Sequence, residues 1–329
     1  MTISVSIIIP VYNGQKTILN CIENIIKKNQ NINKEIIVIN DGSTDKTSKI
    51  LKKIKNIKFF NLKKNKGVGY ARQYGANKAK YDLLCYVDSD VFISKNSIKE
   101  LIKKLKSSST IGSVGAIQKP SNLNKNEWTS NFVCLKSCYG FEDIKKDVDF
   151  SVIHSEFCVI SKKYLNSIGG WKYYSGAGGE EFELGFRIIE SKKRIILIKN
   201  VFYTTFYPNL CTRFKEIIFR TEAYIDLFLK KKRFDSKGSF ATGEQAISSF
   251  ITLIYIAILF ISLFININIY IFMIAVITQI IVEYSFIRFA FKIYGFKMLI
   301  FSIFAIQVIN AGIIIGALKF IQKRIFKII

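Results

Sequence analysis

The stretch Asp82-Leu-Leu-Cys-Tyr-Val-Asp-Ser-Asp90 is an apolar run that ends in two carboxylates. Alternate residues of an extended chain point to the same side, so Asp88 and Asp90 face one way and Ser89 the other. Such a pair suits one hard divalent cation whose other ligands are phosphate oxygens, as in the binding of a nucleoside diphosphate. Taken alone, the triplet is equally well explained as a solvated strand end, so the surrounding sequence has to decide.

Strands alternate with helices around this stretch. We expect strands at 5–9, 35–39, 57–61 and 83–87, with helices ending near residue 29 and at 46–54, 67–78 and 94–105. This alternation predicts a parallel sheet with helices on both faces, whose ligands bind beyond the carboxyl ends of the strands. The segments 10–13, 40–45 and 88–90 each follow a strand directly, so we expect them to line one crevice. Further along, we expect strands at 152–160 and 192–200 and helices at 161–167, 180–191 and 212–232.

The strong positive charge of the chain limits which partners we expect it to bind. The 329 residues include 49 Lys and Arg against 24 Asp and Glu, for a net charge of +25. Such a balance first suggests nucleic acid, but the lysines are scattered and no helix-turn-helix, zinc-finger or RNA-binding signature accompanies them. We therefore expect no nucleic-acid partner and attribute the charge to an anionic membrane face. The six cysteines form no C-x-x-C pair, which indicates a reducing compartment, and the N-terminus lacks the basic region of a signal peptide.

The C-terminal part of the chain is strongly apolar. Runs at 246–265, 269–287 (which contains Glu283) and 298–318 have about the length that spans a bilayer. We expect a catalytic domain over 1–235 and a membrane region over 236–329 with two or three hydrophobic helices; helices of a soluble core are the weaker alternative. The basic run at 230–237 predicts a cytosolic catalytic domain on the cytoplasmic membrane. The same rule opposes a third full span, so 298–318 is either a span or a re-entrant or interfacial segment.

Four segments resemble those of a known enzyme family in order and spacing. They are Ser6-Ile-Ile-Ile-Pro-Val-Tyr-Asn13, Ile39-Asn-Asp-Gly-Ser-Thr-Asp45, the pair 67–75 and 87–90, and Gly178-Gly-Glu-Glu-Phe-Glu-Leu-Gly-Phe-Arg187. The chain resembles the family 2 glycosyltransferases, which are inverting enzymes, over about residues 3–235. The resemblance implies an α/β fold of GT-A type, a Rossmann-like mixed sheet that binds nucleotide-diphospho-sugars. The apolar tail is similar, less specifically, to the all-α transmembrane region of integral members.

The resemblance also implies a role for each matching residue. Glu181 would be the catalytic base, while Asp90 and Asp88 would hold Mg²⁺ or Mn²⁺. Glu180 and Trp171 would face the acceptor. The residues that would bind the nucleotide sugar are Pro10, Val11, Tyr12, Asp41, Arg72, Asp88 and Ser89.

Several of these residues have a structural alternative. Tyr12 and Asp41 also suit a turn, and Trp171 also suits a core. Acids such as Glu181 are favoured in the first turn of any helix. Arg187 can pair with Glu183 four residues away, which makes a structural role the better interpretation for that arginine.

The chain departs from the family pattern in three places. Gly14 stands where many members carry an acid. The stretch 203–207 lacks the histidine that helps many members to bind metal, so the metal would depend on Asp90 and the diphosphate. The segment 210–214 lacks the Gln and Trp of processive synthases, so we expect no processive polymerase. The single histidine, His154, lies in a core-like strand and is expected to be structural.

These features favour a membrane-bound transferase that moves one sugar from a nucleotide-diphosphate sugar to a lipid-linked or glycan acceptor, as in cell-surface polysaccharide assembly. Inverting transfer needs a carboxylate to take the proton of the acceptor hydroxyl and a cation beside the departing diphosphate. A polyprenyl-phosphate sugar synthase is one alternative, although its acceptor is already a phosphate and needs no base. A non-catalytic membrane scaffold is the other.

Overall fold

The computed structural model describes residues 3–121, 127–141, 144–172, 179–231, 243–266 and 268–326. The chain forms two compact units: the first comprises Met1–Lys119 and Asp143–Phe206, and the second comprises Pro120–Glu142 and Tyr207–Ile329. The boundary that we expect at residue 235 therefore falls inside the second compact unit. The functional division into a catalytic domain over 1–235 and a membrane region over 236–329 stays a prediction.

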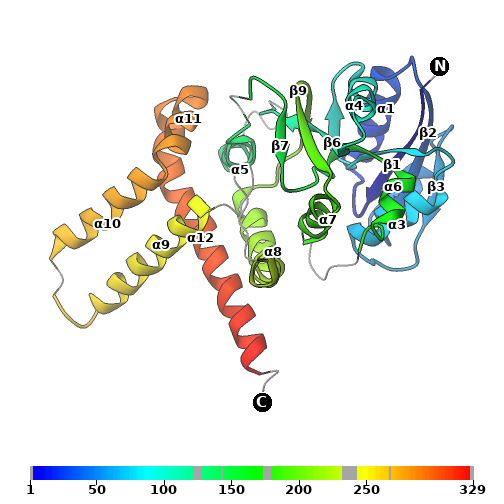
Figure 1. Cartoon of the computed structure of the whole chain (residues 1–329). Helices are drawn as coiled ribbons and strands as arrows, with labels where there is room; N and C mark the ends of the chain where they lie inside the picture. The colour runs from blue at the N-terminus through cyan, green and yellow to red at the C-terminus, as the bar shows by residue number, and fades with distance from the viewer. Residues whose placement is uncertain are drawn as a thin grey trace. The chain divides into compact units, whose positions relative to one another are not determined.

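The first unit is built on a nine-stranded mixed sheet (Figure 1). Its strands run in the order β3-β2-β1-β4-β8-β6-β9-β5, and β7 pairs with β9. The first four strands pair in parallel, as the strand–helix alternation predicts, whereas β8 runs antiparallel to β4 and β6. The strand bounds are β1 (Ser4–Val11), β2 (Asn33–Asn40), β3 (Lys58–Asn61), β4 (Leu83–Val87), β5 (Val91–Ile93), β6 (Ile111–Gln118), β7 (Val148–Phe150), β8 (Phe157–Ser161) and β9 (Arg194–Thr205).

Helices cover both faces of this sheet. The side chains of β1 alternate between the faces: Ile7 and Ile9 pack with the residues of α1 and α4, and Ile8 packs with those of α3, α6 and α7 (Figure 1). Each fully buried isoleucine contributes about 1.5–3 kcal/mol, so the alternation of β1 fixes its register. The helices are α1 (Ile18–Lys28), α2 (Thr47–Leu51), α3 (Val68–Lys78), α4 (Ser97–Lys106), α6 (Lys162–Ser167) and α7 (Gly179–Glu190).

One expected strand begins later in the structure. We expect a strand over 152–160, but β8 starts at Phe157. The preceding residues bend, and the amide N–H of Ser155 donates to the carbonyl of Ile153 at 3.0 Å. This bend places Ser155 and Glu156 at the edge of the sheet where the functional loops gather.

The second unit is all helical. Two of its helices, Gly243–Ile261 and Phe296–Ile325, are long and apolar enough to cross a membrane by length and composition. The apolar run expected at 269–287 is divided at Glu283, so its first helix has only 14 residues. The helices are α5 (Trp128–Cys138), α8 (Leu210–Lys231), α9 (Gly243–Ile261), α10 (Ile269–Val282), α11 (Tyr284–Tyr294) and α12 (Phe296–Ile325).

Candidate active site

Three loops meet at the carboxyl ends of β1, β2 and β4. The backbone N–H of Asn13 donates to Ser43 Oγ at 2.8 Å, and the N–H of Thr44 donates to Asn13 Oδ1 at 2.9 Å, which joins the first two loops. A Cβ added at Gly14 would lie 2.5 Å from Val11 Cγ2 and 3.5 Å from Ser89 Oγ, so only glycine permits this close packing. The three loops that we expect to line one crevice therefore lie against one another.

Arg72 gathers three carboxylates at this crevice. Its Nη2 lies 2.9 Å from Asp88 Oδ1 and 3.8 Å from Glu181 Oε1, and its Nη1 lies 3.2 Å from Glu180 Oε1. The arginine side chain is only 2 % exposed. Four of the predicted site residues, contributed by α3, the end of β4 and α7, are therefore brought together around one buried guanidinium.

Trp171 supports this guanidinium from the core side. The guanidinium carbon of Arg72 lies 5.1 Å from the centroid of the Trp171 ring, which packs edge-on against Tyr86. The Trp171 backbone N–H donates to Gln73 Oε1 at 2.7 Å. The indole is 5 % exposed, so its observed contacts are those of a packed side chain, and a role in facing the acceptor stays a prediction.

The loop that carries Trp171 is clamped by Arg187. This guanidinium donates to the carbonyls of Ile168 and Gly170 and pairs with Glu183, with its Nε 2.8 Å from Glu183 Oε1. The i,i+4 pair expected from the sequence is thus present, and it also fixes the backbone before Trp171. Gly169 and Gly170 have φ values of +88° and +67°, which suit glycine.

Asp90 lies in a crowded acidic environment. Burial raises its pKa to about 7, and the charges of Asp88 and Glu156 add to this effect, while a hydrogen bond from Thr205 opposes it. Glu156 belongs to the bend before β8: its carbonyl accepts from the N–H of Asp88 at 3.0 Å, and its carboxylate accepts from the Tyr203 hydroxyl. Glu156 is not among the site residues predicted from the sequence, because we expect this position to lie inside a strand.

Glu181 is held by two neighbours. Ser155 Oγ donates a hydrogen bond to Glu181 Oε1, and Arg72 Nη2 lies 3.8 Å from the same oxygen. Burial raises the pKa of Glu181 to about 8; Arg72 opposes this rise, and the charges of Glu180 and Glu156 add to it. A carboxyl group with a pKa near neutrality is suited to accept a proton at physiological pH.

The other predicted residues lie at the rim of the crevice or support it. Tyr12 is 50 % exposed, whereas Pro10 and Val11 are buried in β1. The two oxygens of Asp41 accept the backbone N–H groups of Lys66 and Gly67, each at 2.8 Å, so this carboxylate holds the loop before α3.

Two predicted residues remain. Ser89 lies partly buried between the two aspartates, as expected for the central residue of the triplet. His154 is half-buried with its ring packed edge-on against Phe150, and desolvation lowers its pKa to about 4. These contacts agree with the structural role expected for the histidine.

Comparison with known proteins identifies a domain in the first half of the chain. Residues 6–169 match the profile of glycosyl transferase family 2. The glycosyltransferase GlyG of Streptococcus pneumoniae is 26 % identical over 182 residues, with 53 % of each chain covered. An uncharacterized glycosyltransferase of Haemophilus influenzae is 38 % identical over 104 residues, or 29 % of this chain and 40 % of the relative. The chain thus spans about half or less of the length of these curated relatives.

Solved structures agree on the fold. The mannosyltransferase PcManGT from Pyrobaculum calidifontis, solved with GDP-Man and Mn²⁺, aligns with a TM-score of 0.58 at 14 % identity, covering 98 % of this chain and 88 % of its own. GalNAc-T7, solved with UDP, GalNAc and Mn²⁺, aligns with a TM-score of 0.52 at 16 % identity. The alignment covers 68 % of this chain and 48 % of GalNAc-T7. The chain therefore carries a glycosyl transferase family 2 domain on a sheet of the GT-A fold.

Proposed function

We propose that this protein is a membrane-bound glycosyltransferase. It moves one sugar from a nucleotide-diphosphate sugar to a hydroxyl group of a lipid-linked glycan precursor, in the assembly of cell-surface polysaccharide, by a metal-assisted inverting displacement. The observation that carries the proposal is the buried Arg72, which ties Asp88 of the Asp-Ser-Asp segment to Glu181 at the start of α7. Arg72 thereby holds Asp88, which would bind the donor, close to Glu181, which would act on the acceptor.

The donor would lie in the crevice formed by the three loops. Tyr12 is exposed there and available to stack on a nucleotide base. Asp41 would hydrogen-bond the base with its remaining lone pairs, next to the loop that it already holds. The two aligned structures were solved with UDP or GDP-Man, which supports a nucleotide-diphosphate sugar as the donor class.

The residues of the Asp-Ser-Asp segment fit a divalent cation. Asp88, Asp90 and Glu156 crowd their negative charges together, and carboxylate oxygens are the ligands that Mg²⁺ and Mn²⁺ prefer. Among the described residues no three His, Cys, Asp or Glu side chains form a ready-made metal site. Asp90, with Asp88, would therefore hold the ion together with the diphosphate oxygens. The bound ion would offset the charge that develops on the leaving diphosphate.

Glu181 would act as the general base. It would take the proton from the acceptor hydroxyl as the oxygen attacks C1 of the donor sugar. Ser155 and Arg72 fix the orientation of its carboxylate, and Glu180 holds the other end of the guanidinium. This arrangement favours a hydroxyl acceptor over a phosphate acceptor, which would need no base.

The helices of the second unit support a lipid environment. The buried residues of α9 are all polar (Gln245, Ser248, Ser249 and Thr252), whereas Phe250 and Ile254 are 63 % and 44 % exposed. This is the reverse of a helix on a water-soluble protein. The basic residues that follow α8 in the sequence support a cytosolic catalytic domain.

Hydrogen bonds and an ion pair join several of the polar groups inside this helical unit. Asn310 of α12 donates to Ser248 and Thr252 of α9, each at 2.9 Å. Lys136 of α5 pairs with Glu283 at 2.8 Å, and both side chains are at most 10 % exposed. Paired charges and bonded amides are what helices in a bilayer require of their interior polar groups.

Transfer into lipid tests the proposal. Membranes that contain the protein would be given labelled UDP-, GDP- and dTDP-sugars with Mg²⁺ or Mn²⁺, and the lipid fraction would be counted. We expect metal-dependent transfer from one donor, and we expect Glu181→Gln to lower it at least about 100-fold. Transfer that persists in Glu181→Gln would indicate a phosphate acceptor, as in a polyprenyl-phosphate sugar synthase. If no donor binds the purified protein, the scaffold interpretation would replace this one.

A further inference from the structure

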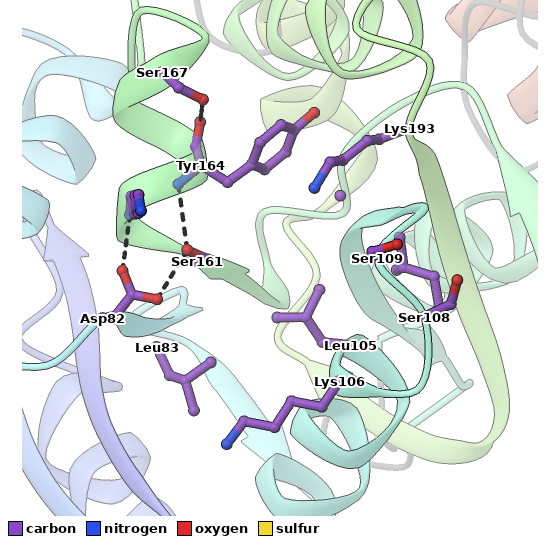
Figure 2. A pocket seen from close by; sticks show the side chains of 13 residues that line it. Asp82, Leu83, Leu105, Lys106, Ser108, Ser109, Ser161, Tyr164, Ser167 and Lys193 are labelled. Atoms are coloured by element: carbon purple, nitrogen blue, oxygen red, sulfur yellow. Dashed lines mark hydrogen bonds between the residues drawn. The ribbon is translucent and has the colours of Figure 1, made fainter.

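A hollow lies at the amino end of β4, away from the candidate active site (Figure 2). This hollow, here named the β4-edge pocket, has a volume of about 470 Å³, within the range of small-molecule sites. Its lining includes the first residues of β4 and β6 and the last residue of β8 (Leu83, Ile111 and Ser161). The Asp-Ser-Asp segment follows the other end of β4, which at roughly 3.3 Å per residue is about 13 Å away. A ligand in this pocket would leave the candidate active site free.

The pocket has an apolar floor and an aromatic wall. Leu105 and Ile111 are almost fully buried, and the ring of Tyr164 stands beside them. A Cβ added at Gly112 would lie 3.0 Å from this ring, so the glycine lets Tyr164 approach β6 closely. Lys193 Nζ lies over the Tyr164 ring, 4.3 Å from its centroid, so the apolar floor and the edge of the ring are what suit the C–H face of a sugar.

Lysine side chains give the pocket a positive charge. Lys106, Lys163 and Lys193 line it, and none of the three pairs with a carboxylate within the part of the chain that the structure describes. The lining acid, Asp82, is already engaged: it accepts from Ser161 Oγ and from the N–H of Lys163, each at 2.9 Å. Figure 2 shows Lys193 reaching toward Tyr164 on one side and Lys106 lying below Leu105 on the other. The three lysines therefore retain their capacity to bind an anion.

We propose that the β4-edge pocket binds an anionic saccharide, that is, a sugar ring carrying a phosphate or carboxylate group. The sugar ring lies on the apolar floor beside the edge of the Tyr164 ring, and the anionic group faces the three lysines. The same chemistry fits an acidic unit of a glycan chain and a free acidic sugar. The proposal does not depend on the function proposed above, because binding here needs neither the Asp-Ser-Asp segment nor Glu181.

Binding of simple probes tests this proposal. The full chain, purified in detergent micelles and carrying Asp90→Asn in EDTA to weaken the candidate donor site, would be titrated calorimetrically with glucose 1-phosphate, glucuronate, inorganic phosphate and glucose. We expect both acidic sugars to bind at least about tenfold more tightly than glucose or inorganic phosphate, and less tightly as salt is added. The triple variant Lys106→Gln, Lys163→Gln, Lys193→Gln should weaken their binding by about tenfold or more.

A matched control makes the same change in charge elsewhere. The variant Lys27→Gln, Lys99→Gln, Lys103→Gln alters exposed lysines outside the pocket and should leave binding within about twofold. An equal loss in both triple variants would overturn the proposal, because the effect would then be one of net charge. Equal binding of glucose and glucose 1-phosphate, or no binding up to about 10 mM, would overturn it as well. Tighter binding of a glucuronate-containing disaccharide than of glucuronate would identify a glycan chain, and the reverse a free acidic sugar.

Discussion

The guanidinium of Arg72 lies 2.9 Å from the carboxylate of Asp88, and this pair joins the middle of the site to the end of β4. Asp88 is partly open, with a side chain 26 % exposed, whereas Arg72 is 2 % exposed. The arginine is thus a buried anchor, and the aspartate is the side of the pair that a ligand can reach. Because Arg72 also contacts Glu180 and Glu181, its loss would affect both halves of the proposed reaction.

We expect Arg72→Met to lower the free energy of unfolding by about 3–5 kcal/mol, because it leaves the buried carboxylate of Glu180 without its cation. Arg72→Lys should cost less but still reduce donor binding, since an ammonium group cannot replace the two-pronged guanidinium. Chemical denaturation of the detergent-solubilised protein measures the first effect. Arg194→Met is the matched control: its ion pair with Asp149 is exposed and screened by solvent, so its loss should change the stability far less. Equal losses in the two methionine variants would contradict the anchoring role of Arg72.

The raised pKa of Asp90 predicts a pH dependence of stability. Because its folded-state value is about 7 against an ordinary 3.8, the folded protein binds more protons between these values, and its stability falls as the pH rises from about 4 to about 7. In EDTA, Asp90→Asn should remove this part of the fall, on the order of 4 kcal/mol, and be the more stable protein at pH 8. Thermal unfolding of the wild type and of Asp90→Asn at several pH values measures this difference in stability.

The metal part of the same prediction concerns cation binding at pH 8. Mg²⁺ or Mn²⁺ with a nucleoside diphosphate should raise the unfolding temperature of the wild type and have a much smaller effect on Asp90→Asn. Asp149→Asn serves as the control for the pH dependence. The pair with Arg194 lowers the pKa of Asp149, so its contribution to stability is lost as the pH falls, the opposite of Asp90. A cation-induced rise of the same size in Asp90→Asn would place the metal elsewhere.

Glu181→Gln should reduce the transfer rate by about 10²–10⁴-fold, since it removes the proposed general base. Donor binding should change little, because the role proposed for Glu181 is toward the acceptor. In the wild type, kcat/KM should rise with pH up to about 8, as the carboxylate forms, and this rise should be absent from the residual activity of the variant. Glu190→Gln, at the other end of the same helix, should behave as the wild type. If kcat/KM of Glu181→Gln still rises fully with pH, the titrating group is another residue.

Ser155 positions Glu181, and its removal has a distinct signature. The Ser155 hydrogen bond lowers the pKa of Glu181 against the effect of burial. Ser155→Ala should therefore shift the rise of kcat/KM to higher pH by about one unit, with a smaller loss of rate at high pH. Ser167→Ala, which removes an exposed hydroxyl bonded only to a local carbonyl, is the control. A loss of rate without any shift in the pH profile would show that Ser155 acts only through packing.

The first half of the sheet and its loops follow from local sequence patterns. The apolar runs that become β1, β2, β3 and β4 are each followed by polar turn residues, and this is enough to predict the crevice. The pairing of Arg72 with Glu180, 108 residues away, depends on tertiary packing and is invisible to such patterns. Ser155 and Glu156 were missed for a related reason: the apolar residues around them suggest a strand, but the chain bends there.

Ile254 distinguishes a lipid environment from a watery one. It is 44 % exposed near the middle of α9, among other apolar side chains. In a bilayer, Ile254→Asp should cost about 2.5–3.5 kcal/mol and reduce the amount of protein that sediments with membranes after carbonate extraction. On a water-exposed helix the same substitution would cost little and improve solubility, because the isoleucine would be replaced by a hydrated group. Ile254→Val is the matched control and should retain wild-type membrane association. If Ile254→Asp also remains fully membrane-bound and equally stable, α9 does not lie in the hydrocarbon core.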